Sequence, residues 1–297
     1  MESIKKLIHG KESYVVWYDD YVVKRPLPSF GEPKKMEWLA RQERAKKKID
    51  EIVSTKKPGV YNIPRIVGIN RDEFAVIEER AFGGHLCCNL YRGLNRSQKY
   101  KIIYGIATFI SDMNNLRQPK QLHMEKLSPD KVDEANKILY QTETFIPVVD
   151  FKYILRMQEE LKSVEYDTVA FWSHGDLNQG NVMFDVTNDK LSFIDFADAR
   201  YEDIYRGIAS PVTVWLDIIT KVYRAYKELS NNVPKSFGIN DYDVDKFTKY
   251  RALSLMMKNI ISECRRMLKV DESRKQESAV AICKIVKHMQ QFHKQHG

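Results

Sequence analysis

The sequence has few cysteines and no long apolar run. Only four of its 297 residues are cysteine. They form neither the dense set of a disulfide-rich secreted domain nor a CxxC pair that binds zinc. No segment approaches the roughly 18 uncharged apolar residues that a membrane-spanning helix needs. The first residues, MESIKKLIHGKE, lack the apolar stretch of a secretory signal. We therefore expect free thiols, no membrane association and a location in the cytoplasm.

The composition is that of an ordinary globular protein with a basic excess. Hydrophobic residues make up 43% and charged residues 30% of the chain, and its length is sufficient for two packed units. Much of the net charge of +8 lies in one helical segment, where few aromatic residues alternate with the basic ones as base stacking would require. We interpret it as a solvated helix face and expect no nucleic-acid partner. Its basic residues are Lys34, Lys35, Arg41, Arg44, Lys46, Lys47, Lys48, Lys56 and Lys57.

The first 80 residues predict a small sheet with one long helix. The β-branched and aromatic runs YVVW (14–17) and YVVK (21–24) are separated by YDD and indicate a hairpin. Prolines and a glycine then interrupt the chain, and a charged helix is expected from about 34 to 54. Two more strands are expected at 64–69 and 74–78, joined by the turn NRDE.

The remaining residues predict a mostly helical lobe. A polar connector, EERAFGG (78–84), separates residues 1–80 from residues 85–297. Apolar residues at helical spacing follow Ser97. One hairpin interrupts the helices, formed by VMFD (182–185) and LSFID (191–195) around the turn VTNDK. The other helices are expected at 130–142, 150–163, 212–229, 243–268 and 272–297.

The segment SHGDLNQGNVMFD (173–185) concentrates polar residues just before that hairpin. Turns prefer these residue types, so a plain surface loop is the alternative. However, His174, Asp176 and Asn181 have the spacing H-x-D-x-x-x-x-N, and Asp195 follows the hairpin. Because a hairpin brings its open ends together, we expect Asp176, Asn181 and Asp195 to converge. Amide and carboxylate oxygens suit Mg²⁺ shared with nucleotide phosphates, and Asp176 can accept a proton from a substrate hydroxyl.

Lys24 is the candidate cation for nucleotide phosphates. It ends the second strand-like run, after a candidate phosphate loop GKES (10–13). The charged helix carries Glu43, and Glu37 as a second choice, either of which could pair with Lys24 and hold it in place. We favour Glu43. In isolation Lys24 would be read as an exposed strand lysine, and only the ordered set of motifs points to a nucleotide role.

Taken in order, these motifs resemble a known family. The lysine-ended hairpin, helix glutamate, EERAFGG, HGDLNQGNVMFD and FIDFADA are similar to the aminoglycoside phosphotransferase and choline kinase-like branch of the protein-kinase-like fold. HGD and IDF are closer to this branch than to protein kinases, which usually have HRD and DFG. The resemblance covers roughly residues 8–205. It implies an α+β bilobal protein-kinase-like fold, with an N-terminal antiparallel-sheet lobe that binds nucleotide and a larger, mostly helical C-terminal lobe.

The resemblance implies roles for the polar segment. The catalytic loop would be residues 173–185 and the metal-binding segment residues 191–199. Asp176 would be the catalytic aspartate, Asn181 and Asp195 would bind Mg²⁺, and His174 would support the loop by hydrogen bonding.

The resemblance also implies a nucleotide site in the first lobe. Lys24 would contact the phosphates with Glu43 as its partner, and Ser13 of the phosphate loop would donate to a phosphate. In the connector, the backbone of Glu79 and Ala81 would hydrogen-bond adenine. ATP or GTP and Mg²⁺ are therefore the expected cofactors.

Three functions follow from this interpretation. The leading one is a kinase that phosphorylates a hydroxyl of a small metabolite or antibiotic; the others are a protein or other macromolecule kinase and a catalytically silent nucleotide-binding module. The four retained residues that argue against silence are Lys24, Asp176, Asn181 and Asp195. Acidic residues such as Glu202, Asp203 and Asp217 are weak candidates for lining a pocket for a cationic acceptor. Asp198 receives no role, and the acceptor and the oligomeric state stay open.

Overall fold

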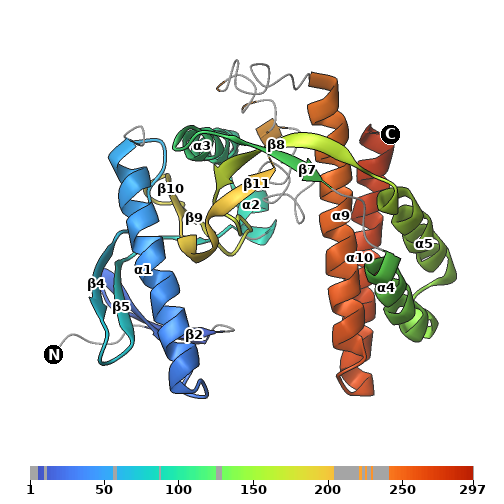
Figure 1. Cartoon of the computed structure of the whole chain (residues 1–297), viewed down its shortest axis with the longest axis horizontal. Helices are drawn as coiled ribbons and strands as arrows, with labels where there is room; N and C mark the ends of the chain where they lie inside the picture. Colours follow the sequence, from blue (N-terminus) through green and yellow to red (C-terminus); the bar gives the residue numbers. More distant parts are fainter. Residues whose placement is uncertain are drawn as a thin grey trace. The chain divides into compact units, whose positions relative to one another are not determined.

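The structure of the protein is a computed structural model that describes residues 6–9, 12–55, 59–86, 88–124, 129–203, 221–222, 225, 229 and 241–296 (Figure 1). Its contacts divide the chain into two compact units. The first comprises Met1–Pro119, Phe171–Glu202 and Lys221–Asn231, and the second comprises Lys120–Ala170, Asp203–Thr220 and Asn232–Gly297. Whether the connector 78–84 separates two functional lobes stays a prediction.

The first unit contains a five-stranded antiparallel sheet in the order β1-β2-β3-β5-β4. The predicted hairpin is present as β2 and β3, in which Val15 lies opposite Lys24. The two later strands were also predicted, and they pair with each other as β4 and β5. The strand at the edge, β1, was not predicted. The five strands span Lys6–His9 (β1), Ser13–Trp17 (β2), Tyr21–Pro26 (β3), Ile66–Asn70 (β4) and Ala75–Glu79 (β5).

One long helix, α1 (Glu32–Thr55), contacts this sheet (Figure 1, blue). It begins two residues before the predicted start, with Pro33 in its first turn, where a proline is tolerated. Its buried side chains recur every three or four residues, which places them on one face of a helix. This buried face decides which polar side chains of α1 turn toward the sheet and which turn to solvent. The buried residues are Trp38, Leu39, Gln42, Ala45, Ile49 and Ile52.

The rest of the first unit forms the support of the predicted catalytic loop. Helix α3 (Arg96–Asn115) begins at a capping box, in which Asn95 and Gln98 exchange hydrogen bonds between side chain and backbone. The ring of Phe109 on α3 stacks on that of Phe193, with centroids 3.9 Å apart. Phe193 ends the second strand of the hairpin, two residues before the predicted end at Asp195. The other elements are β6 (Gly84–His85), α2 (Cys88–Gly93), β9 (Val182–Asp185), β10 (Lys190–Phe193) and the 3₁₀ turn η2 (Phe196–Asp198).

The second unit is mostly helical, as predicted. Helices α9 and α10 pack against each other (Figure 1, orange and red), and α9 also packs against α4 and α5. Their shared core is apolar, with Leu139, Ile154, Ile260 and Ile282 fully buried or nearly so. The elements are β7 (Lys120–Met124), α4 (Pro129–Thr142), η1 (Glu143–Phe145), α5 (Val148–Lys162), the first part of β8 (Tyr166–Ser173), α9 (Asp241–Met267) and α10 (Glu272–His296); β11 (Arg200–Asp203) crosses the boundary between the units.

The remaining sequence-based predictions concern a pair of strands, one helix, the thiols and membrane-spanning segments. The pairing of β7 with β8 was not predicted, because we expected only one hairpin among the helices. The expected helix at 212–229 lies largely outside the described residues. Cys264 and Cys283 are free thiols, as expected. No helix in the described part of the chain combines the length and the apolar character needed to cross a membrane.

Candidate active site

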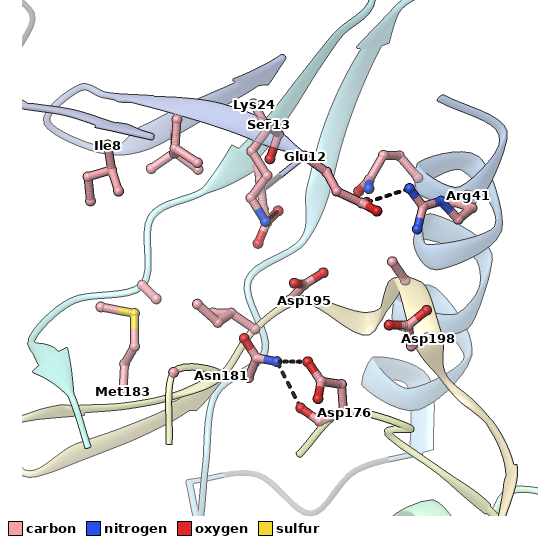
Figure 2. A pocket seen from close by; sticks show the side chains of 18 of the residues that line it. Ile8, Glu12, Ser13, Lys24, Arg41, Asp176, Asn181, Met183, Asp195 and Asp198 are labelled. Atoms are coloured by element: carbon pink, nitrogen blue, oxygen red, sulfur yellow. Dashed lines mark hydrogen bonds and ion pairs between the residues drawn. The ribbon is translucent and has the colours of Figure 1, made fainter. Parts of the chain in front are cut away.

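A cavity of about 520 Å³ opens in the first unit between the sheet, α1 and the catalytic loop (Figure 2). Its size is within the range of small-ligand pockets. The expected convergence of Asp176, Asn181 and Asp195 is observed, because all three side chains line this cavity. Among the predicted catalytic, nucleotide-binding and metal-binding residues, only Glu43 does not line the cavity. The predicted residues that line the cavity are Ser13, Lys24, Glu79, Ala81, Asp176, Asn181 and Asp195.

His174 supports the catalytic loop from beneath. It is 1% exposed, its Nε2 lies 2.9 Å from the carbonyl oxygen of Ile194, and its ring contacts Phe109 and Phe196. Burial lowers the pKa of His174, although the Ile194 carbonyl and nearby carboxylates act in the opposite direction. The imidazole therefore favours its neutral form, which links the catalytic loop to the segment that carries Asp195.

Gly175 explains why a glycine follows this histidine. Its φ of +83° lies in the left-handed region, and a Cβ placed there would come within 1.8 Å of the backbone oxygen of Asp198. A side chain at this position would therefore separate the catalytic loop from η2. The glycine allows the two segments to approach closely enough for their carboxylates to face one cavity.

Asp176 and Asn181 are joined by hydrogen bonds (Figure 2). The amide Nδ2 of Asn181 donates to the backbone oxygen of Asp176 at 2.8 Å and to its carboxylate Oδ2 at 3.1 Å. Between them, the backbone N–H of Gly180 donates to Oδ1 of Asn178 at 2.7 Å and shapes the turn. Because its nitrogen faces Asp176, the Asn181 amide presents its carbonyl oxygen as the atom suited to a cation.

Asp195 is held in an unusual backbone conformation. Its φ and ψ are 65° and 69°, in the left-handed region, which residues with a Cβ rarely adopt. Such strained residues are concentrated at functional sites. Asp195 lies between β10 and η2, and its side chain is exposed to the cavity. Figure 2 shows Asp195 beneath Lys24 and close to Asn181.

The partner of Lys24 differs from the prediction. Its Nζ lies 2.6 Å from Oε2 of Glu78, and both side chains are largely buried, at 17% and 5% exposure. Burial disfavours charge on Lys24, but the carboxylates of Glu78 and Asp195 outweigh it and raise the pKa of Lys24. The pKa of Glu78 is raised by burial, against the opposing effect of Lys24. The raised pKa of Lys24 favours its protonated form.

The expected pairing of Lys24 with Glu43 is therefore corrected. Glu43 forms an ion pair with Arg71 instead, at 2.7 Å, and the second choice, Glu37, is exposed. The reason is the phase of α1. Gln42 lies on the buried face, and the next residue of a helix is rotated by about 100° from it, so Glu43 turns away from Lys24.

The register of the sheet explains why Glu78 takes this place. In the pair formed by β3 and β5, Val22 lies opposite Glu78 and Lys24 lies opposite Val76. Lys24 and Glu78 are therefore diagonal neighbours on one face of the sheet, a separation that long side chains can bridge. The signal in the sequence that could have identified Glu78 is a glutamate directly after the apolar residues of the strand AVIEE.

The connector places Glu79 and Ala81 beside the cavity. The backbone N–H of Glu79 donates to the carbonyl oxygen of Arg65 at 2.8 Å. This N–H is therefore not available to a nucleobase, and the Glu79 carbonyl is the candidate acceptor. Contacts of Glu79 and Ala81 with a nucleobase stay a prediction.

Several charged residues at the cavity were not assigned a role from the sequence. Asp198 lines it beside Asp176, and Arg41 of α1 and Glu12 of the turn before β2 form an ion pair at its edge (Figure 2). The basic face of α1 is therefore not wholly solvated, because Arg41 turns into the cavity. Lys48 also turns inward, and its Nζ donates to the carbonyl oxygen of Ala199 at 2.6 Å. Lys48 fastens α1 to the end of η2.

The acidic residues considered for a cationic acceptor behave differently. Glu202 is 6% exposed and its Oε1 lies 2.8 Å from Arg200. Asp203 is 2% exposed and pairs with Arg251 at 3.3 Å. Both carboxylates are thus buried and already neutralised by arginine, which argues against a role in acceptor binding. Asp217 lies outside the described residues.

The oxygen donors at the cavity fit a magnesium ion better than a tightly caged metal. Among the residues that the structure describes, no three His, Cys, Asp or Glu side chains converge as a metal cage. Asn181 and Asp195 supply one amide oxygen and one carboxylate. Mg²⁺ is commonly held in this way, by one or two protein oxygens together with substrate phosphates and water.

Solved structures with a similar fold are known. Wild-type aminoglycoside 2′-phosphotransferase-IIIa, solved as its GDP complex, is 14% identical, with 97% of this chain and 93% of that chain covered and a TM-score of 0.60. ADP-bound aminoglycoside phosphotransferase APH(2″)-Ib is 17% identical, with 97% and 95% covered and a TM-score of 0.52. A choline/ethanolamine kinase family protein from Mesorhizobium loti is 10% identical, with 98% and 90% covered and a TM-score of 0.53. No curated protein matches the sequence.

The shared fold is that of protein-kinase-like phosphotransferases, so the predicted fold class is confirmed. The model of the phosphotransferase enzyme family matches residues 3–226, which is most of the chain. The protein belongs to the phosphotransferase enzyme family and is an enzyme of the kinase type, as the motifs indicated.

Proposed function

We propose that the protein is a small-molecule kinase, which transfers the γ-phosphoryl group of ATP or GTP to a hydroxyl of a small acceptor. One observation carries the proposal: Lys24, Asp176, Asn181 and Asp195 line a single cavity of about 520 Å³ in a chain of this family. Similar structures contain GDP or ADP, and one contains kanamycin with GDP. These neighbours support a nucleotide donor and a small acceptor.

The nucleotide would lie between the sheet and the hairpin. Lys24, held by Glu78, would contact the phosphates with a fixed positive charge, and Ser13 would donate a hydrogen bond to them. The Glu79 carbonyl and the backbone N–H of Ala81 would contact the nucleobase. Asn181 and Asp195 would hold Mg²⁺, which when bound neutralises negative charge on the phosphates.

Asp176 is the proposed catalytic residue. Its exposed carboxylate is oriented by the Asn181 amide and faces the cavity. In the reaction, the acceptor oxygen forms a bond to the γ-phosphorus while the bond from that phosphorus to the β–γ bridging oxygen breaks. The nucleoside diphosphate leaves, and Asp176 accepts the hydroxyl proton. Positioning and neutralisation of charge supply most of the rate.

A screen of acceptors tests the proposal. Consumption of ATP and of GTP would be measured with aminoglycosides, choline-like alcohols, amino-acid alcohols and sugars, with a generic protein substrate alongside. Transfer of phosphate to one of the small molecules is expected. Preference for the protein would favour a macromolecule kinase instead, and binding of nucleotide without transfer to any acceptor would favour a silent module.

Substitutions at the site separate chemistry from binding. Asp176→Asn should lower kcat by about 10²-fold or more and leave nucleotide affinity nearly unchanged. Asp189→Asn is a matched control, because Asp189 lies in the β9–β10 turn with a φ of 53°, a conformation that asparagine tolerates. It should retain activity. Asp195→Ala should instead weaken binding of the magnesium–nucleotide complex. Full turnover by Asp176→Asn would remove Asp176 from its proposed role.

A further inference from the structure

The described residues that line the cavity carry far more negative than positive charge. Six of them are carboxylates, whereas Lys24 and Arg41 are the only lysine and arginine side chains in the set. Lys24 is already paired with Glu78. A nucleoside triphosphate is itself strongly anionic, so its phosphates need every cation that the site can supply. The carboxylates are Glu12, Glu78, Glu79, Asp176, Asp195 and Asp198.

Arg41 is placed to be the second of these cations. It lies on α1 beside Gln42, on the side of the helix that turns to the cavity. Its guanidinium donates through Nη2 to Oε2 of Glu12 at 2.5 Å. Its Nε is buried and has no hydrogen-bond partner among the described residues. The guanidinium therefore retains hydrogen-bonding capacity that Glu12 does not use.

Glu12 is the more exposed member of this pair. Its side chain is 53% exposed, compared with 28% for Arg41, and it comes from the turn that precedes Ser13 and β2. Figure 2 shows Glu12 next to Ser13, and the pair above Asp195 and Asp198 in this view. An exposed carboxylate holds an arginine only weakly, so a ligand of higher negative charge can replace it.

We propose that Arg41 is a phosphate-binding residue and that its guanidinium is ion-paired with Glu12 until a nucleotide binds. This inference rests on the proposed function, since it assumes a triphosphate in the cavity. On binding, the phosphates take the place of the Glu12 carboxylate at Arg41. Phosphate oxygens match the planar fork of a guanidinium and form charge-assisted hydrogen bonds with it. Glu12 then turns to solvent and no longer contacts α1.

The proposal predicts opposite effects for the two members of the pair. Arg41→Gln should weaken binding of ATP or GTP by about 10- to 100-fold, the range for losing a hydrogen bond to a charged group. Glu12→Gln should tighten it by about 2- to 5-fold, because the competing exposed ion pair is lost. Neither change should alter the affinity for adenosine or guanosine, which have no phosphates. Arg41→Lys, which keeps the charge without the fork, should fall between wild type and Arg41→Gln.

The double variant distinguishes competition from simple repulsion. If Glu12 acts through Arg41, then Glu12→Gln combined with Arg41→Gln should bind ATP as weakly as Arg41→Gln alone. If Glu12→Gln still tightens binding about 2- to 5-fold in that background, then Glu12 merely repels the phosphates, and the proposal that it competes with them for Arg41 is overturned. Glu12 is exposed, so this variant should fold and its result stands even if Arg41→Gln is unstable.

Titration calorimetry of the full chain with magnesium–ATP, magnesium–GTP and the two nucleosides provides these affinities. Arg71→Gln is the matched control, since Arg71 forms a similar ion pair with α1 but does not line the cavity; it should bind ATP as wild type does. Wild-type affinity in Arg41→Gln, or an equal loss for adenosine, would overturn this inference alone. A wild-type chain that binds neither nucleotide would overturn the proposed function as well.

Discussion

Replacing Glu78 by glutamine removes the charge that holds Lys24. The two side chains lie 2.6 Å apart and are 5% and 17% exposed, so the lysine ammonium would lose its nearest carboxylate within a largely buried site. Removing one member of a buried ion pair costs about 3–5 kcal/mol, because the other charge is left uncompensated. Glutamine keeps the volume and can still accept a hydrogen bond. We therefore expect the lower end, a loss of about 3 kcal/mol in the free energy of unfolding.

Glu43→Gln provides the contrast. Glu43 pairs with Arg71 at 2.7 Å, but these side chains are 33% and 75% exposed. Exposed ion pairs contribute about 0–1 kcal/mol, so this variant should lose less than 1 kcal/mol. The two substitutions are chemically identical and differ in burial. The sequence alone favoured Glu43 as the partner of Lys24, so the comparison also tests the correction that the structure makes.

Urea unfolding at equilibrium, followed by tryptophan fluorescence, measures both losses as shifts of the midpoint at constant m value. Lys24→Met in the Glu78→Gln background should recover part of the lost stability, because it removes the unpaired ammonium. The recovered variant should still bind nucleotide poorly. A loss of under 1 kcal/mol for Glu78→Gln, or equal losses for the two glutamate variants, would refute the assignment of Glu78 as the residue that holds Lys24.

Two further predictions concern the catalytic loop. Burial lowers the pKa of His174, so below about pH 6.5 the unfolded chain binds a proton that the folded chain does not, and the free energy of unfolding decreases as the pH is lowered. Between pH 7.5 and 5.5 the loss is up to about 1.4 kcal/mol, and urea midpoints should show it for wild type and not for His174→Gln. Parallel pH profiles of the two proteins would contradict this prediction. Gly175→Ala places a methyl group 1.8 Å from the Asp198 backbone oxygen, so it should lower the free energy of unfolding by more than about 2 kcal/mol and abolish most activity. Gly59→Ala is the control, because Gly59 has a φ of +85° but no atom within 4 Å of the added methyl group, and it should lose about 1 kcal/mol. Equal thermal shifts for the two variants would count against the clash.

The convergence of the catalytic residues was predictable because it follows from short-range geometry. Asp176, Asn181 and Asp195 flank one hairpin, and a hairpin brings its ends together whatever surrounds it. Their expected roles came from spacing, residue type and the family resemblance, whereas the cavity was not predicted. The same reasoning located β2, β3 and most helices, since their signals lie within a few residues of one another.

The partners of Lys24 and Arg41 required information that is not local. Glu78 is identified only when the register of β3 against β5 is known, because a shift of one residue would turn it to the other face. The phase of α1 decides that Arg41 and not Glu43 lines the cavity, because residues two apart on a helix are rotated by about 200°. The pairing of β7 with β8 was missed for a related reason: a helical segment lies between the two strands, so no turn signal joins them in the sequence.

The left-handed backbone of Asp195, together with the magnesium-binding role proposed for it, sets the evolution of heat resistance against catalysis. A residue with a Cβ gives up roughly 1–2 kcal/mol in that conformation, and glycine or asparagine would relieve part of it. Selection for a higher melting temperature alone would therefore favour replacing Asp195, and stabilised libraries of this enzyme should accumulate inactive members at this position. Thermostable variants that still turn over would have to gain their stability elsewhere and keep the strained carboxylate.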